Sequence, residues 1–138
     1  VVNAHLEAFA SANRMEHADK TAEQLDAKNP YTVLLGDMNY TPPEAKLRKN
    51  FPDEPETDMS RDDTIDRLRN IPSMAEVVPE RVYQDNEHSW FTFPAHAPNR
   101  RLDYIFHGSG LTLVRAEVPQ MTAPPSDHLP VIARFRLD

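Results

Sequence analysis

Hydrophobic and polar positions near the start of the chain predict a strand, a helix and a second strand. Val1 to Leu6 is typical of a strand, and Tyr31 to Leu35 is an aliphatic and β-branched run of the same kind. Between them, Glu7 to Lys28 contains neither Pro nor Gly and is rich in Ala, Glu, Gln and Lys, so it predicts a helix. We expect its buried face to contain Leu6, Phe9, Ala10, Asn13, His17 and Leu25.

The order strand, helix, strand is a crossover connection, which joins two parallel strands. His5 lies near the end of the first strand, and Asp37 follows the second. Both residues are therefore expected at the same edge of a sheet.

The rest of the chain is predicted to form further strands and a short helix. Residues 61–70 predict a helix with Ile65 and Leu68 facing inward, and the connection 107–110 predicts a hairpin. If the last strand runs antiparallel to the strand before Asp37, its beginning lies beside that residue. The elements together predict an α/β (α+β) fold with a mixed, mainly antiparallel sheet and flanking helices. The further strands are expected at 89–93, 101–107, 111–118 and 130–137.

Composition narrows the classes of function. The chain has 138 residues, enough for a single domain, and its 15 basic and 22 acidic residues give a net charge of −7. This balance does not supply a broad positive field, so we do not expect strong non-specific binding to nucleic acid. The absence of cysteine excludes disulfides and thiolate metal sites. No apolar run approaches the ~20 residues of a membrane span. We expect a soluble protein, and composition does not fix its compartment as cytoplasmic or secreted.

The motif Gly36-Asp37-Met38-Asn39 follows the second predicted strand. Asp37 and Asn39 are two residues apart, so in an extended chain their side chains point the same way. Aspartate is an oxygen ligand suited to Mg²⁺ or Mn²⁺, and asparagine can hold water or a phosphate oxygen without adding negative charge. The alternative is a turn in which both side chains cap their own backbone.

A second polar motif, Ser126-Asp127-His128, precedes the last predicted strand. By itself it could be a loop that begins a strand, with His128 bonded to a carbonyl. Asp103 favours a functional role for this motif over a plain loop. A carboxylate among apolar strand residues needs a partner, and a histidine at a neighbouring strand end can provide one. An Asp–His pair keeps the imidazole protonated or fixes its tautomer, as a group facing a phosphate requires.

Two further groups of charged residues are weighed against plainer roles. Paired arginines suit phosphate geometry, so Arg101 is a candidate substrate-binding residue, whereas Arg100 is more readily a surface charge. The acidic run from Asp53 to Asp58 is typical of a solvated loop. It does not indicate a calcium site, because it has neither the glycine turn nor the regular spacing of ligands that such a site requires.

Four motifs in this order resemble the endonuclease/exonuclease/phosphatase family, which has the DNase I-like fold. The motifs are Asn3-Ala4-His5-Leu6, Gly36-Asp37-Met38-Asn39, Leu102-Asp103-Tyr104-Ile105 and Ser126-Asp127-His128-Leu129-Pro130-Val131. The stretch from Thr92 to Arg101 is similar to bacterial members. The resemblance implies the C-terminal half of a four-layer α/β sandwich, so that residues 1–138 form a partial domain whose N-terminal half is missing. The first strand, already under way at Val1, agrees with that expectation.

The resemblance also implies roles for individual residues in a phosphoesterase. His5 would contact the scissile phosphate, and Asp37 would position or deprotonate the attacking water. Asn39 would hold that water or a phosphate oxygen. Whether the base is Asp37 or a histidine stays open.

The remaining implied roles concern the metal and the developing charge. Asp127, together with Asp37, would bind Mg²⁺ (or Mn²⁺), and His128, oriented by Asp103, would stabilise charge on the phosphate. The family also uses a metal-binding glutamate and an asparagine from its N-terminal half, and neither position exists in this sequence.

The missing half leads to expectations about partners. We expect association with the missing segment or self-association, and we expect the isolated chain to be inactive or nearly so. The substrate is a phosphate ester of unknown type, which the sequence does not assign to DNA, nucleotides, inositol phosphates or phospholipid headgroups. The alternative is an inactive fragment that acts only through association with another chain.

Overall fold

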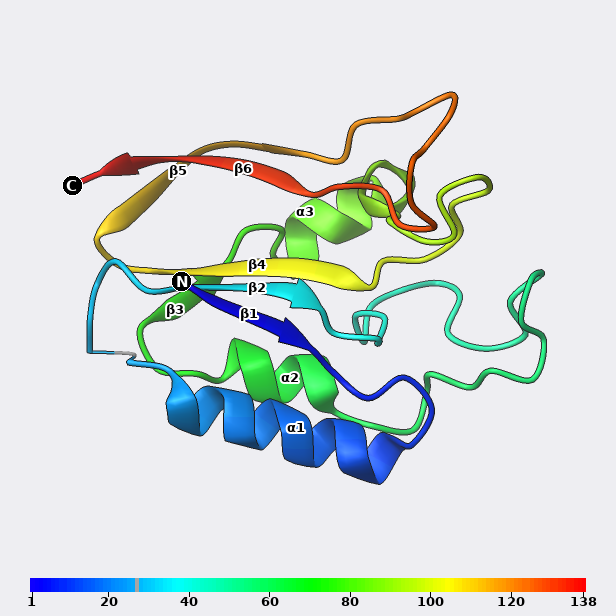
Figure 1. Ribbon diagram of the computed structural model, residues 1–138, viewed down its shortest axis with the longest axis horizontal. Coiled ribbons are helices and arrows are strands. Elements are labelled where there is room, and N and C mark those ends of the chain that lie inside the picture. Colours follow the sequence, from blue (N-terminus) through cyan, green and yellow to red (C-terminus); the bar gives the residue numbers. More distant parts are fainter. Residues whose placement is uncertain (27) are drawn as a thin grey trace.

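The structure is a computed structural model that describes residues 1–26 and 28–138. Within these residues the chain forms mixed α/β structure, which agrees with the predicted class (Figure 1). The strands are β1 (Val2–His5), β2 (Val33–Asp37), β3 (Met74–Glu76), β4 (Asp103–Gly108), β5 (Leu111–Glu117) and β6 (Ile132–Leu137). The helices are α1 (Ser11–Gln24), α2 (Thr64–Arg69), α3 (Glu80–Asp85) and the 3₁₀ helix η1 (Glu87–Trp90).

The larger sheet has the strand order β1-β2-β4-β3. β1 and β2 run parallel, which confirms the predicted crossover, and His5 is the direct partner of Asp37. β4 runs antiparallel to β2 and places Asp103 opposite Asp37. The register of three strands therefore brings these polar residues to one end of the sheet.

Gly36 allows β1 and β2 to approach each other just before the polar end of β2. Its φ of 138° lies in a region that residues with a side chain rarely adopt. A Cβ atom at this position would lie 1.9 Å from the carbonyl oxygen of Ala4. Glycine is therefore required where the strand delivers Asp37.

Helices α1 and α2 cover one face of the larger sheet, as Figure 1 shows. Ile65 and Leu68 of α2 face inward, as predicted. The predicted buried face was only partly right. Leu6 and Leu25 are buried, but Phe9, Asn13 and His17 are exposed, and the buried residues within α1 are Arg14 and Ala18. The core on this side contains Leu6, Ala18, Leu34, Ile65, Leu68, Tyr104 and Phe106.

Strands β5 and β6 form a separate antiparallel pair that lies over the other face of the sheet. Two expectations were wrong. The turn at 109–110 carries the chain from β4 into the second layer instead of closing a hairpin between paired strands, and β6 pairs with β5 instead of extending the sheet beside β2. The second core, between the layers, includes Val33, Leu35, Ile105, Leu113, Ala133 and Phe135.

The segment between α2 and β4 also departs from expectation. The strand expected at 89–93 is replaced by η1 and by an isolated bridge between Phe93 and Arg100, and α3 was not predicted.

Among the residues that the structure describes, no helix is both long enough and apolar enough to cross a membrane.

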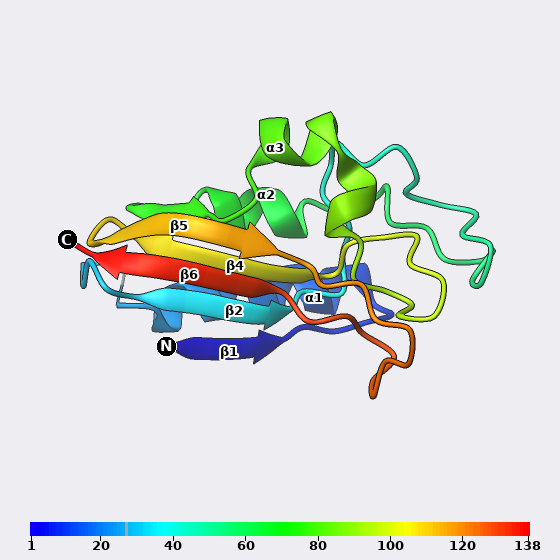
Figure 2. The ribbon, with the colours of Figure 1, turned by 90° about the horizontal axis from the view of Figure 1, so that it is seen from above.

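The β5–β6 pair does not extend over β1. Viewed from above in Figure 2, β6 lies over the region between β4 and β2, whereas β1 lies beyond it. In agreement, Asn3 and His5 of β1 are exposed, and Val33 and Leu35 of β2 are only partly buried. One part of the sheet face is therefore open to solvent.

Candidate active site

Six of the seven residues that the sequence nominated line one cavity of about 470 Å³. They come from the ends of β1, β2 and β4 and from the loops that adjoin β2 and β6. The cavity is of the size that small-molecule sites occupy. These six residues are His5, Asp37, Asn39, Asp103, Asp127 and His128.

The turn after β2 holds Asp37 and Asn39 in place. Asp37 Oδ1 accepts a hydrogen bond from the backbone N–H of Asn39 at 2.8 Å, so the capping role weighed from sequence is present. Asn39 has φ 50°, a left-handed conformation that asparagine tolerates better than most residues. Its side-chain amide donates to the Leu6 carbonyl at 2.8 Å and ties the end of β1 to this turn.

Asp103 and Asp37 lie on either side of the His128 imidazole. His128 Nδ1 is 2.8 Å from Asp103 Oδ2, and His128 Nε2 is 3.7 Å from Asp37 Oδ2. The partner of His128 is thus a carboxylate and not a backbone carbonyl. Both ring nitrogens face negative charge, an arrangement that favours the protonated imidazolium.

The pKa values of the two central groups are shifted in the same direction. Hydrogen bonding to Asp103 raises the pKa of His128 above its ordinary value, and the charge of Asp37 adds to this effect. Burial raises the pKa of Asp37, and the nearby charge of Asp103 raises it further, against the hydrogen bond from Asn39. A carboxylate with a raised pKa is better suited to accept a proton near neutral pH.

His5 is exposed at the cavity wall, with 76% of its side chain accessible to solvent. Its Nε2 lies 3.6 Å from Asp37 Oδ2, the same oxygen that faces His128. Two imidazoles therefore flank one carboxylate oxygen at the cavity wall.

Asp127 and His128 are positioned by a backbone connection to the loop before β4. The amide of Ala95 donates to the Asp127 carbonyl at 2.7 Å, and the amide of Leu129 donates to the Thr92 carbonyl at 2.7 Å. The His128 ring also lies against Phe93, with ring centroids 4.8 Å apart. These contacts, together with the hydrogen bond to Asp103, hold the imidazole in place.

The oxygen donors suit a hard divalent cation. Among the described residues, ligand atoms of Asp37, Asp103 and His128 lie within 4.8 Å of one another. Asp103 is engaged with His128, and a protonated imidazole has no lone pair to give, so an Asp103–His128 ion pair would be a poor pair of metal ligands. Carboxylates such as Asp37 and Asp127 are the donors that Mg²⁺ or Mn²⁺ prefers.

Arg101 is not available to a substrate, so the role expected for it is not supported by its position. The residue is 1% exposed, its Nη1 lies 2.7 Å from Glu76 Oε1, and the same atom donates to the Val78 carbonyl at 3.1 Å. Glu76 also accepts from Arg69 at 2.6 Å. The guanidinium belongs to a buried ion-pair network beside β3 because its charge needs partners there.

The structure instead brings Arg100 to the cavity. Its guanidinium lies between the rings of Phe51 and Phe93 and pairs with Asp53 and Glu54, both at 2.9 Å. The acidic run is therefore anchored to the site instead of being wholly solvated. Sequence reasoning missed this contact, and pairing across 46 residues or more leaves no local signal.

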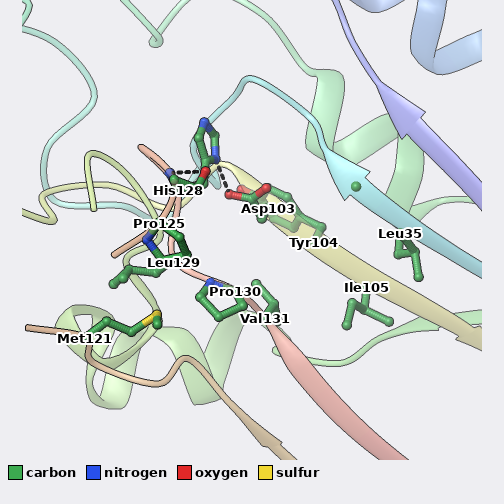
Figure 3. A pocket seen from close by; sticks show the side chains of 12 residues that line it. Leu35, Asp103, Tyr104, Ile105, Met121, Pro125, His128, Leu129, Pro130 and Val131 are labelled. Atoms are coloured by element: carbon green, nitrogen blue, oxygen red, sulfur yellow. Dashed lines mark hydrogen bonds and ion pairs between the residues drawn. The ribbon is translucent and has the colours of Figure 1, made fainter. Parts of the chain in front are cut away.

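A second, mainly apolar pocket of about 440 Å³ lies on the other side of the pair formed by His128 and Asp103. Figure 3 shows this pair at one end and Leu35, Ile105 and Val131 farther along. Its lining combines residues of β2 and β4 with the loop that leads into β6.

The layered fold, with an acidic cavity that contains two histidines at the end of the larger sheet, defines a DNase I-like α/β protein. The family model described as the Endonuclease/Exonuclease/phosphatase family matches residues 2–128. The chain belongs to this family. A comparison with curated proteins gave no match.

Solved structures support the fold. A mannosyl-6-phosphatase of Bacteroides thetaiotaomicron is 18% identical with a TM-score of 0.61, and the alignment covers 98% of this chain and 50% of that protein. A family protein from the same organism is 17% identical with a TM-score of 0.66, covering 99% and 49%. A functionally unknown conserved protein of Enterococcus faecalis is 16% identical with a TM-score of 0.66, again covering 99% and 49%. The chain thus spans about half the length of the structures that it matches.

Proposed function

We propose that this chain supplies one half of the active site of a phosphoric-ester hydrolase that depends on Mg²⁺ or Mn²⁺. The observation that carries the proposal is the series from Asp103 through His128 to Asp37, with His5 beside it in one cavity. The family supports ester hydrolysis in general, and the choice between a phosphomonoester and a phosphodiester, including a nucleic acid, stays open.

The residues divide the chemical work by position. Asp37 accepts a proton from the attacking water, whose oxygen bonds to phosphorus as the bond to the leaving-group oxygen breaks. The His128 imidazolium, held by Asp103, stabilises negative charge on the phosphoryl group, and the exposed His5 contacts the phosphate. Asn39 holds the water or a phosphate oxygen through its remaining hydrogen-bonding capacity.

Asp37 and Asp127 are the proposed ligands of the divalent cation. Bound there, the cation supplies positive charge for the phosphoryl and leaving-group oxygens. Because the carboxylates of this half are few, further oxygen ligands come from the other half of the site.

We propose that the other half covers the open part of the sheet. A strand paired with β6 on its free side would lie over β1 and β2 and would cover the apolar pocket beside Leu35 (Figures 2 and 3). Burying this surface stabilises the fold and completes the site. The chain by itself is then inactive or nearly so.

The half-length match equally favours a second function, that of an inactive fragment that acts only by association with another chain.

The test uses the protein at its natural length with a generic phosphodiester and a phosphomonoester, with and without Mg²⁺. We expect metal-dependent release of product, lowered at least a hundredfold by His128→Ala and by Asp37→Ala, on the scale of a lost catalytic group (about 10²–10⁴-fold). Val82→Ala, at an exposed site on α3, serves as the control. Activity that both site substitutions leave intact would exclude the proposal, and metal binding without turnover would favour the associating fragment.

A further inference from the structure

Phe9 is 95% exposed at the wall of the same cavity that contains His5 and Asp37. Isolated exposed apolar side chains are common and carry no message by themselves. Phe9 differs in two respects, its place beside the reacting groups and the rigidity of the loop that carries it.

A buried arginine holds the Phe9 loop. Arg14 is 3% exposed and donates from Nη1 to the carbonyls of Glu7 at 2.8 Å and Ala8 at 2.9 Å. Asp62 fixes the same guanidinium at 2.8 Å. The Phe9 backbone N–H in turn donates to the Glu7 carboxylate at 2.9 Å. The phenyl ring is therefore presented by a preorganised loop, as binding subsites require.

A fixed carboxylate lies in the wall of the same cavity. Glu54 lines the cavity and pairs at 2.9 Å with Arg100, which is itself 1% exposed. Arg100 lies between the rings of Phe51 and Phe93, at 4.4 and 4.6 Å from their centroids. The Thr57 hydroxyl donates to Glu54 at 3.2 Å. The carboxylate is thus held in place by a clamp that the phosphate chemistry does not use.

We propose that Phe9 and Glu54 form a subsite for the leaving group, and that this leaving group is a compact hydroxylated ring such as a hexose. The inference rests on the proposed phosphoesterase function and specifies its substrate class. The C–H face of a sugar packs on an aromatic ring, and its hydroxyl groups donate to a carboxylate, which only accepts. The cavity of about 470 Å³ has room for one such ester.

The same wall disfavours a polynucleotide. Flanking phosphates of a nucleic-acid chain would approach Glu54 and Asp53, whose two negative charges exceed the single positive charge of Arg100 that pairs with both. A single nucleotide could still stack its base on Phe9, since aromatic rings stack bases without regard to sequence. That competing ligand is therefore part of the test.

The experiment uses the protein at its natural length with Mg²⁺. It measures kcat/KM for a hexose 6-phosphate and for a nucleoside 5′-monophosphate, and the inhibition constant of inorganic phosphate, which reports on the phosphate position alone. We expect hexose 6-phosphate to be preferred. Phe9→Ala should lower its kcat/KM about fivefold, through KM, and Glu54→Gln about tenfold, each with the phosphate inhibition constant unchanged.

Matched variants separate this subsite from general effects. Phe9→Tyr keeps the ring and should lower kcat/KM less than Phe9→Ala does. Glu56→Gln removes an exposed charge of the same loop that does not line the cavity, and it should change none of the three constants. Circular dichroism checks that each variant is folded.

Three results would overturn the inference. If Phe9→Ala and Glu54→Gln left all three constants unchanged, as Glu56→Gln is expected to do, the proposed subsite would be excluded. A nucleotide preference that is lost in Phe9→Ala would assign Phe9 to base stacking instead. A protein that neither hydrolyses a phosphate ester nor binds inorganic phosphate would refute the proposed function itself, which is distinguishable from the first two results.

Discussion

Asp37 and Asp103 are direct partners across the antiparallel strands β2 and β4, and both carboxylates face the imidazole of His128. Adjacent carboxylates repel each other, and a cation between them relieves that repulsion. This relationship accounts for the raised pKa of His128, whose largest cause is the hydrogen bond to Asp103. The protonation of His128 therefore reports on whether the two carboxylates lie beside it.

Asp103→Asn should lower the pKa of His128 toward its ordinary value, because the variant replaces the charged acceptor of the imidazolium proton with a neutral one. Histidine C–H resonances followed by NMR in metal-free buffer measure this pKa directly. A wild-type His128 that titrates at or below the pKa of a free histidine would contradict the assignment.

The same shift predicts the pH dependence of stability. Folding raises the pKa of His128, so the contacts of its imidazolium stabilise the folded protein. This stabilisation is complete below the pKa of His128 in the unfolded chain, about 6.5, and it is lost as pH rises through the higher pKa of the folded protein. The difference in free energy of unfolding between wild type and Asp103→Asn should therefore be largest at acid pH and shrink as pH rises. Urea denaturation at several pH values measures it, and a difference that grows with pH would argue against the mechanism.

Gly36→Ala should destabilise the protein by about 3 kcal/mol or more, because the new Cβ meets the backbone of β1 and the residue has a positive φ. Gly110→Ala is the matched comparison. There the nearest atom is the edge of the Tyr31 ring, a side chain that can move, so the cost should be smaller. Urea denaturation measures both variants, and equal losses would contradict the close approach of β1 to β2.

Arg101→Met should cost about 3 kcal/mol of stability, since it breaks a buried ion pair and leaves Glu76 with Arg69 alone. Binding of inorganic phosphate should be unchanged in the folded variant, because Arg101 is buried and does not line the cavity. Arg81→Met, at an exposed position of α3, should change neither property. Loss of phosphate binding without loss of stability would restore the substrate-binding role that the sequence suggested.

The convergence of polar residues could be predicted because it depends on strand order and on local motifs. The parallel crossover predicts that His5 and Asp37 lie at the same edge of the sheet. The pairing of Asp103 with His128 is predicted because a carboxylate among apolar residues needs a partner. Their positions around one cavity were accessible from sequence, although β6 reaches the site from the second layer and not from beside β2. Their catalytic roles remain proposals.

Contacts between distant residues could not be predicted. Arg14 occupies a helix position that a hydrophobic stripe leaves out, and it is buried because Asp62 pairs with it across 48 residues. Arg100 and Arg101 are neighbours in sequence, yet one lines the cavity and the other pairs with Glu76. Periodicity reports which side chains are apolar, whereas the burial of an arginine depends on partners that only the folded chain brings near.

The open edge of β6 predicts that the chain by itself associates. Ile132 and Leu137 of β6 are exposed, and the sheet face over β1 and β2 is only partly covered. Unpaired strand edges and exposed apolar surface favour pairing with another chain. Sedimentation velocity on the chain of residues 1–138 should show species larger than a monomer, and a dye that binds apolar surfaces should fluoresce.

A charged residue on that edge should reduce the association. Ile132→Lys places a charge where a further strand would pack and should shift the sedimentation profile toward monomer, whereas Val82→Lys, on the exposed side of α3, should leave it unchanged. If Val82→Lys were as effective as Ile132→Lys, net charge and not the β6 edge would control the assembly. A compact wild-type monomer without dye binding would show that the open face needs no cover, and the proposal that a second half completes the site there would be abandoned.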